Sequence, residues 1–381
     1  MTSVGHNNDD ISNELALAGI KREVIRVFPF WKVFVELREA YRRKPELVSC
    51  EISVLARVPC QHFAGVDLLW VQSDIVVTNK KIIRRDRKMN KVECQVDKLQ
   101  SKFCSMHFVH RNAHRAGDAG SYNLQSVLSL DMPEQMQCVA GNILHFTLLV
   151  HGMLRHAQCG DHSNSSFTIL PSPFSAIVIL GMGGNSIGCG LRHILGSEAN
   201  IHLVEIEPAV VQVCKTVGLV KEEKNTHIHL GSAEEALHKC PINCTIIFMD
   251  AFEPIGGHMV NTMNIIKSAF DHLEADGLLV INEHSIPNEE QLAPLLQIFG
   301  NHNVQYINIR GCEESVIVAP KPGGKLDGLG SQCSKRLANK ILSIFDSTHP
   351  RWMPNYMWIK QSRAICVQKE PTPMYARQWT S

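Results

Sequence analysis

Short apolar runs alternate with amphipathic segments through most of the second half of the chain. The apolar runs have the length of strands, whereas the segments between them repeat their apolar positions at helical spacing. Strands of this kind joined by helices are typical of a parallel sheet covered on both faces. We therefore expect strands at Ala176–Leu180, Ile201–Glu205, His227–Leu230, Thr245–Met249 and Leu278–Asn282. We expect helices at Ile187–Leu195, Pro208–Val217, Ser232–His238, Thr262–Leu273 and Glu289–Phe299, and a terminal hairpin at Val304–Ile309 and Ser315–Val318.

A different pattern covers residues 48–130, where the apolar segments are shorter, β-branched or alternating, and separated by polar turns. This pattern is typical of an antiparallel β domain. One expected turn is the polar sequence Thr78-Asn79-Lys80. The expected strands are Ile52–Val58, Leu68–Val71, Ile75–Thr78, Lys81–Arg84, Val92–Val96 and Phe103–Val109.

Other segments flank these two regions. Residues 1–13 are polar, and apolar positions over residues 15–37 return at helical spacing. Asp131 is a candidate N-cap for a further helix, and residues 160–173 have the Ser, Asn and Pro content of a linker. The predicted fold is α/β, with a doubly wound Rossmann-like sheet preceded by a small antiparallel β domain. The predicted divisions are a tail and helical segment (1–47), the β domain (48–130), a connecting helix and linker (131–172), the Rossmann-like domain (173–320) and a C-terminal loop and helix extension (321–381).

Composition limits the classes of binding partner and the cellular compartment that we expect for this protein. A formal net charge of +1 gives no global basic field, which argues against nucleic acid as a partner. The 13 cysteines are scattered singly without a CxxC pair, which favours reduced thiols in the cytosol or nucleus, and we expect a cytoplasmic protein. The start of the chain lacks a secretory or transit pattern, and the longest apolar run, Ile143–Leu154, is too short to span a bilayer. We expect no membrane association. The sequence is compatible with a homo-oligomer.

The sequence between the first two expected parallel strands suggests a nucleoside site. Gly181, Gly183 and Gly184 follow the first strand, and Glu205 ends the second. Glycines there let the backbone approach a ligand and direct the next helix N-terminus toward it. An acid at the end of the second strand can hold both hydroxyls of a ribose.

Two other chemistries could use this turn. A dinucleotide site would require G-x-G-x-x-G, but Ser186 stands at the last glycine position. The segment Gly184-Asn185-Ser186-Ile187-Gly188 also matches the G-x-S-x-G nucleophile elbow of hydrolases, with Asp250 and His284 following in the order Ser, Asp, His. In an elbow, however, the strand leads directly into the first glycine, and here Gly181 to Gly183 intervene.

A third chemistry is an S-adenosylmethionine-type nucleoside, which has no pyrophosphate and tolerates a looser glycine turn. Its sulfonium and amino acid tail need a carboxylate near the carboxyl edge of the sheet. Asp250 ends an apolar strand and is placed for that role, or to accept a proton from an amine. Glu253 adds a second acid to the same loop.

At these residues the sequence resembles the spermidine-synthase-like branch of the class I S-adenosylmethionine-dependent methyltransferases, and within it the enzymes that methylate translation elongation factor 1-alpha. The family patterns are V-G-x-G-G-G-S, V-E-I-D-P, a G-D-A-type turn and an apolar strand ending in Asp. They stand here as Gly181-Met182-Gly183-Gly184-Asn185-Ser186, Val204-Glu205-Ile206-Glu207-Pro208, Gly231-Ser232-Ala233 and Phe248-Met249-Asp250. The likeness extends over residues 66–319 and implies a methyltransferase fold for residues 173–320.

The resemblance implies S-adenosylmethionine as cofactor and a protein amine as substrate. Glu205 would bind the ribose, Ile206 would flank the adenine, and Ser232 and Ala233 would lie beside the adenine amine. Asp250 and Glu253 would be the catalytic residues at the transfer centre. The residues implied to line the methionine moiety are Gly181, Gly183 and Gly184.

Departures from the family pattern keep two alternatives open. Ser232 stands where the family usually has an acid bonded to the adenine amine, which suits a noncatalytic scaffold with this fold. Polyamine synthases carry Asp-x-x-Asp-Pro after the fourth strand, and this chain has Asp250-Ala251-Phe252-Glu253-Pro254. They also carry a Tyr-Gln pair near the helix before the linker, and residues 133–137 contain no tyrosine.

One segment has metal-ligand residue types. Cys104, His107, His110 and His114 are spaced like ligands, but a zinc site normally pairs two such clusters. In a strand, Cys104 and His110 would share one face and His107 would lie on the other. We therefore predict no metal site.

Overall fold

The computed structural model describes residues 48–86, 91–111, 122–129, 176–195, 197–221, 223–252, 263–283, 289–300, 303–308, 315–324 and 377–379. The helices and the linker predicted within 1–47, 131–172 and 325–376 lie outside these residues. Contacts divide the chain into two compact units, one of residues 1–60 and 64–139 and one of residues 61–63 and 140–381. Among the described residues, no helix combines the length and the apolar character needed to cross a membrane.

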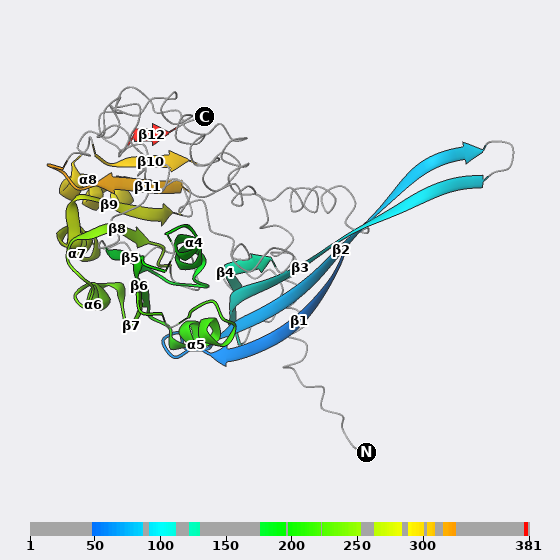
Figure 1. The fold of residues 1–381 in the computed structure, drawn as a ribbon, viewed down its shortest axis with the longest axis horizontal. Coiled ribbons are helices and arrows are strands. Elements are labelled where there is room, and N and C mark those ends of the chain that lie inside the picture. Colours follow the sequence, from blue (N-terminus) through cyan, green and yellow to red (C-terminus); the bar gives the residue numbers. More distant parts are fainter. Residues whose placement is uncertain are drawn as a thin grey trace, which may run out of the picture. The chain divides into compact units, whose positions relative to one another are not determined.

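The first unit contains an antiparallel sheet, as predicted, and its strand order is β1-β2-β3-β4. Its two long strands pair from Val66↔His110 to Asp86↔Lys91 and form the extended ribbon seen in Figure 1. The sheet is built from β1 (Val48–Pro59), β2 (Val66–Asp86), β3 (Lys91–His110) and β4 (Tyr122–Ser129).

The turn predicted at residues 78–80 is wrong. Thr78, Asn79 and Lys80 lie inside β2 and pair with Lys98, Asp97 and Val96 of β3. The partner strand satisfies the backbone N–H and C=O groups whatever the side chains are, so turn propensity did not decide the conformation.

The second unit contains a sheet in the order β12-β10-β11-β9-β8-β5-β6-β7 (Figure 1). Strands β5 to β9 are parallel to one another, and β11 and β10 add an antiparallel hairpin. Its strands are β5 (Ala176–Leu180), β6 (Asn200–Glu205), β7 (Thr226–Leu230), β8 (Cys244–Met249), β9 (Leu273–Glu283), β10 (Gln305–Asn308), β11 (Ser315–Pro320) and β12 (Arg377–Trp379). The predicted fold class is confirmed. In this sheet only β12, which pairs in parallel with β10, had no counterpart in the prediction, and in the first sheet β4 had none.

Helices cover both faces of this sheet. In Figure 1, α6, α7 and α8 lie on one side and α4 on the other. The core on the first side joins fully buried residues of the three helices, such as Leu237, Ile266 and Leu295, to alternate residues of the strands. The helices are α4 (Ser186–Leu195), α5 (Pro208–Thr216), α6 (Ala233–Leu237), α7 (Met263–His272) and α8 (Glu289–Phe299).

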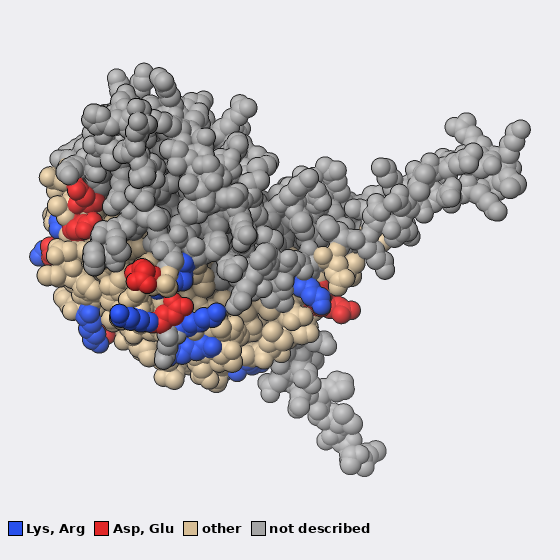
Figure 2. Space-filling view, viewed as in Figure 1, with Lys and Arg blue, Asp and Glu red and all other residues tan. Residues whose placement is uncertain are grey.

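The strand order reverses at β5. From β5 the chain moves outward through β6 to β7, and then returns to β8 on the other side of β5. The carboxyl ends of β5, β6 and β8 therefore meet at a topological switch point, where open α/β sheets bind their ligands. On the face shown in Figure 2, the described Lys and Arg side chains are interspersed with Asp and Glu.

Candidate nucleoside-binding site

The first glycine of the bend is fixed by close backbone packing. Gly181 follows β5 with a φ of +89°, and its N–H donates to the Val204 carbonyl at 3.1 Å. A Cβ at Gly181 would lie 2.4 Å from the carbonyl oxygen of Asp250. Only glycine fits between the ends of β6 and β8 in this conformation.

The rest of the bend uses an asparagine where the family pattern has a glycine. Gly183 has a φ of +49° and Asn185 a φ of +58°. Asparagine is among the few residues that tolerate this left-handed region, and the Asn185 Nδ2 donates to the Leu219 carbonyl at 2.7 Å. Gly188 makes room for this side chain, because a Cβ there would lie 2.0 Å from the Asn185 Oδ1. Sequence reasoning missed this pair, although a glycine in the first turn of a helix was its signal.

The geometry of the bend does not support the hydrolase interpretation. The residue before Ser186, Asn185, has the left-handed conformation, and Ser186 is the first residue of α4. A nucleophile elbow instead holds its serine in the strained turn itself. His284, the third member of that hypothesis, lies outside the described residues.

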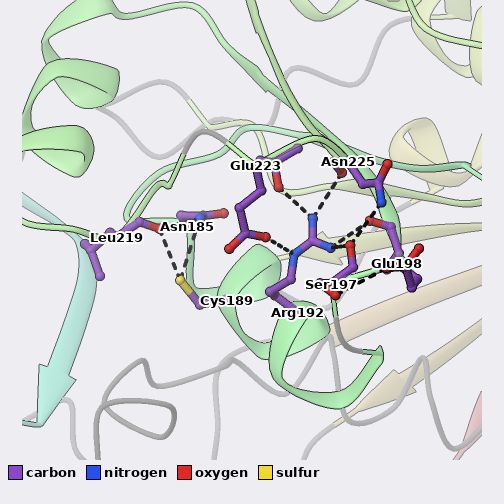
Figure 3. Close-up of polar contacts among 10 residues, drawn as sticks. Asn185, Cys189, Arg192, Ser197, Glu198, Leu219, Glu223 and Asn225 are labelled. Atoms are coloured by element: carbon purple, nitrogen blue, oxygen red, sulfur yellow. Dashed lines mark hydrogen bonds and ion pairs between the residues drawn. The ribbon is translucent and has the colours of Figure 1, made fainter.

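Helix α4 is anchored at its far end by Arg192 (Figure 3). The two terminal nitrogens of Arg192 donate to the carbonyls of Ser197 and Ala199 at 2.9 and 2.8 Å and to the Asn225 carbonyl at 3.0 Å. Its Nε lies 3.4 Å from a carboxylate oxygen of Glu223. These contacts hold the connections into β6 and β7 and so keep the start of α4 in place behind the bend.

The Glu205 carboxylate points at the bend. Its Oε2 accepts a hydrogen bond from the Gly183 N–H at 3.1 Å, and its Oε1 accepts one from the Glu207 N–H at 3.0 Å. The residue is 8% exposed. Burial raises the pKa of the Glu205 carboxyl, whereas the backbone N–H groups around it act in the opposite direction. Since a carboxylate can accept about four hydrogen bonds, it retains capacity for a hydroxyl donor.

A second buried carboxylate two residues later has a structural role. Glu207 is the N-cap of α5, and its side chain accepts from the Ala209 N–H at 3.1 Å. Its two oxygens also accept from the Gln61 and His62 N–H groups, which belong to the same compact unit, at 3.0 to 3.1 Å. Glu207 is fully buried, so these donors use its acceptor capacity.

Two apolar side chains remain exposed at neighbouring strand ends. Ile206 follows β6 and is 37% exposed, and Leu230 ends β7 and is 50% exposed. Leu230 is the register partner of Glu205. Sequence analysis named Ile206 but missed Leu230, because only strand pairing brings it beside the acid.

Ser232 is the N-cap of α6. Its hydroxyl oxygen accepts a hydrogen bond from the Glu235 N–H at 3.3 Å, and Ala233 is the first residue of the helix. This capping role explains a serine at this position by helix stability alone. The hydroxyl hydrogen is still available as a donor.

Asp250 is tied to the same edge of the sheet. Its N–H donates to the Leu180 carbonyl at 2.8 Å, immediately before Gly181. Its Oδ1 accepts a hydrogen bond from the Asn282 Nδ2 of β9 at 2.9 Å. Sequence reasoning missed Asn282, which orients the acid, because a single asparagine ending a strand is not a distinctive signal. Glu253 lies outside the described residues.

The described cysteine and histidines of β3, whose spacing resembles that of metal ligands, do not converge on one point. Cys104 and His107 are both buried, and the His107 Nε2 lies 2.7 Å from the Ser105 Oγ. Among the described residues, this segment contains no group of three ligand atoms within metal-binding distance. His114 lies outside the described part of the chain.

The sequence similarity of this chain to known proteins is weak. No protein-family model matches the chain. A polyamine aminopropyltransferase from Vibrio vulnificus (strain CMCP6) is 27% identical over 152 residues, which are 38% of this chain and 48% of that protein. The chain thus spans about half the length of this curated relative.

Solved structures with a similar fold include two kinds of transferase. A probable spermidine synthase from Corynebacterium glutamicum ATCC 13032 matches with a TM-score of 0.46 and 11% identity, over 86% of this chain and 98% of that one. Human methyltransferase-like protein 13, solved with SAH, matches with a TM-score of 0.39 and 13% identity, over 60% of this chain and 96% of that one. The closeness to elongation-factor methyltransferases stays a prediction. The chain has weak sequence similarity to a polyamine aminopropyltransferase.

Proposed function

We propose that this protein is a transferase that uses S-adenosylmethionine to methylate an amine, with a protein amine as the acceptor. The observation that carries the proposal is the hydrogen bond between the Gly183 N–H and the Glu205 carboxylate. It holds an acid capable of binding a ribose directly against the glycine bend at the switch point of the sheet.

Charge supports a cationic nucleoside. No Lys or Arg among the described residues forms an ion pair with Glu205 or Glu207, so the negative charge behind the bend is balanced only by backbone N–H groups. A sulfonium cation bound at this edge would be attracted by that charge and by Asp250.

The exposed apolar surface at the strand ends supports adenine as the base of the bound nucleoside. Ile206 and Leu230 offer exposed apolar surface next to the acid, where a planar base can pack. Ser232 retains one hydroxyl hydrogen, which can be donated to a ring nitrogen of the base. The acid usually found at this position would accept from the adenine amine instead, so the serine predicts weaker donor binding, not its loss.

The residues at the transfer centre need to position and deprotonate an amine. When bound, the donor would supply an electrophilic methyl group whose S–C bond breaks as the N–C bond forms, leaving a neutral thioether. Asp250, oriented by Asn282, is placed to accept the proton that the amine loses. Alignment supplies most of the acceleration in such a transfer, so few further catalytic groups are required. Glu253 is proposed as a second acid for the same amine.

A second candidate is aminopropyl transfer from decarboxylated S-adenosylmethionine. The sequence similarity to the polyamine aminopropyltransferase favours it. The two donors differ by one carboxylate, so they can be separated by binding. A protein that binds neither would be a noncatalytic scaffold.

The test compares three ligands on the full chain by thermal shift and calorimetry. S-adenosylhomocysteine should raise the melting temperature if the protein is a methyltransferase, because a ligand that binds only the folded state stabilises it. A larger shift with decarboxylated S-adenosylmethionine would favour aminopropyl transfer. No shift with S-adenosylmethionine or either of these ligands would overturn both enzymatic proposals.

Glu205→Ala should weaken donor binding about 5- to 150-fold, or roughly 1–3 kcal/mol, because charge-assisted hydrogen bonds to the ribose are lost. The matched control is Glu198→Ala, which removes an exposed acid near the opposite end of β6. Circular dichroism of both variants checks their folding. Equal affinity in the folded Glu205 and Glu198 variants would remove Glu205 from the site.

A further inference from the structure

A cluster of histidine and cysteine side chains lies on the sheet of the second unit, away from the glycine bend. His202 is in the middle of β6, His229 is in β7, and Cys240 follows α6. One ligand atom of each residue, a ring nitrogen or the Cys240 Sγ, lies within 4.8 Å of the other two. Three ligands of the types used by transition metals, two imidazoles and one thiol, therefore converge from three separate segments.

Strand register holds the two imidazoles together. His202 pairs with His227 across the parallel strands, and His229 is two residues further along β7, on the same face. The His202 Nδ1 lies 2.9 Å from the His229 Nε2, and the two rings are stacked with centroids 5.2 Å apart. The backbone of two paired strands thus preorganises both ligands.

Two of the three residues of the cluster are shielded from water. His202 is 6% exposed and Cys240 7%, so both are nearly removed from water. Among the described residues, the His202 Nε2 has no hydrogen-bond partner, although a buried polar atom without one is costly. A metal bound at the Nδ1 that faces His229 would fix the proton of His202 on Nε2.

The distance between the two imidazole nitrogens requires only a small adjustment. Two imidazole nitrogens on a tetrahedral zinc ion, each at about 2.0–2.1 Å, lie about 3.3–3.4 Å apart. The His202 and His229 nitrogens would therefore separate by a few tenths of an ångström from their hydrogen-bonded distance of 2.9 Å. A rotation of the half-buried His229 side chain can supply this movement.

The cluster has a route to solvent. β7 is the edge strand of the sheet, and His227, stacked on His202 with centroids 4.5 Å apart, is exposed. An ion can enter from this side, and a water molecule or His227 can complete its coordination. The donor set of two imidazoles and a thiolate suits zinc.

We propose that His202, His229 and Cys240 bind a zinc ion with three protein ligands and a fourth position at the edge of the sheet. The sequence predicted no metal here, because the residues are 38 positions apart and show no ligand spacing. The zinc site is independent of the donor site at the carboxyl ends of the strands. Its role would be to tie β6, β7 and the segment after α6 together.

The experiment titrates Zn²⁺ into the full chain after treatment with a chelator and a thiol reductant, in competition with a chromophoric chelator. Wild type should bind one equivalent at this site. His229→Gln and Cys240→Ser should each weaken that binding at least about tenfold, as expected for loss of a ligand. Co²⁺ in place of Zn²⁺ should give a thiolate charge-transfer band that Cys240→Ser abolishes.

Two matched controls separate this site from other thiols and histidines. His238→Gln changes an exposed histidine two residues before Cys240, and Cys50→Ser changes a cysteine of the other unit; both should retain wild-type binding. Circular dichroism verifies that each variant is folded, and the edge position of His229 makes its variant the more tolerant one. Absence of stoichiometric Zn²⁺ binding, or binding and a Co²⁺ spectrum unchanged in the folded His229 and Cys240 variants, would overturn the proposal.

Discussion

Both sheets bury a carboxylate, but they neutralise it differently. In the antiparallel sheet, Asp67 is 4% exposed and forms ion pairs with Arg57, at 2.6 Å, and with Arg111. In the parallel sheet, Glu205 and Glu207 are also buried and accept only backbone N–H groups in the described structure. The first arrangement balances charge within the protein, whereas the second leaves a net negative charge that a cationic ligand can complement.

This difference has a physical origin. Arg57 and Arg111 reach Asp67 through long side chains that are partly exposed and can adjust. Backbone N–H groups cannot move without moving the chain, so Glu205 keeps its position only while the bend keeps its shape. The acid of the parallel sheet therefore depends on its glycines, and the acid of the antiparallel sheet depends on its arginines.

The largest effect is expected at the bend. Gly181→Ala should destabilise the parallel sheet by about 4 kcal/mol or more, because its Cβ would overlap backbone atoms of Asp250 and Ala251 and its φ is strained. Gly65→Ala in the other unit is the matched control, since its φ is +73° but the nearest atom is 4.0 Å away. It should cost only about 1 kcal/mol. Hydrogen exchange of the amides of β5 to β9 and of β1 to β3 measures the stability of each unit. Equal losses of stability in the two variants would contradict this dependence on the glycine.

Removing the acids tests the comparison directly. Glu207→Gln should cost about 2–4 kcal/mol, because its amide group would face N–H groups that need an acceptor. Asp67→Asn should cost only about 1 kcal/mol, because its arginines are partly exposed and can turn to water. Raising the salt concentration should reduce the Asp67 effect and leave the Glu207 effect unchanged. Denaturant unfolding followed by hydrogen exchange provides the measurement, and the reverse salt dependence would refute the distinction.

A smaller effect is expected from pH. Burial lowers the pKa of His107 in the antiparallel sheet to about 3. The unfolded chain therefore binds a proton near pH 6.5 that the folded chain refuses, so stability is complete above pH 6.5 and falls as the pH drops toward 3. Below pH 6 the free energy of unfolding should change by about 1.4 kcal/mol per pH unit, and His107→Gln should make it depend less on pH. Unfolding measured at pH 7, 6 and 5 tests this, and parallel curves for the two proteins would contradict it.

The parallel sheet could be predicted from the sequence because its signal is local. Ala176–Leu180 is a continuous apolar run, and the structure places β5 over the same residues. The glycines after it and Glu205 were also identified, since a strand end followed by a turn fixes where such residues lie. The contact between the Gly183 N–H and Glu205 follows from the parallel pairing of β5 and β6.

Other features could not be predicted because they depend on partners distant in sequence. The segment Thr78 to Lys80 has the composition of a turn, but pairing with β3 makes it a strand. Asn282 contacts Asp250 only because β9 lies beside β8. The three-residue strand β12 exists only beside β10.

The sequence by itself determined the alternation of strands and helices, the glycine bend and the acid that follows it, because each depends on neighbouring residues. The tertiary structure alone decided which carboxylate lacks a cation, which amide orients Asp250, and that His202, His229 and Cys240 meet. The physical reason is that strand order and register bring together side chains that are far apart in the sequence and share no local sequence pattern.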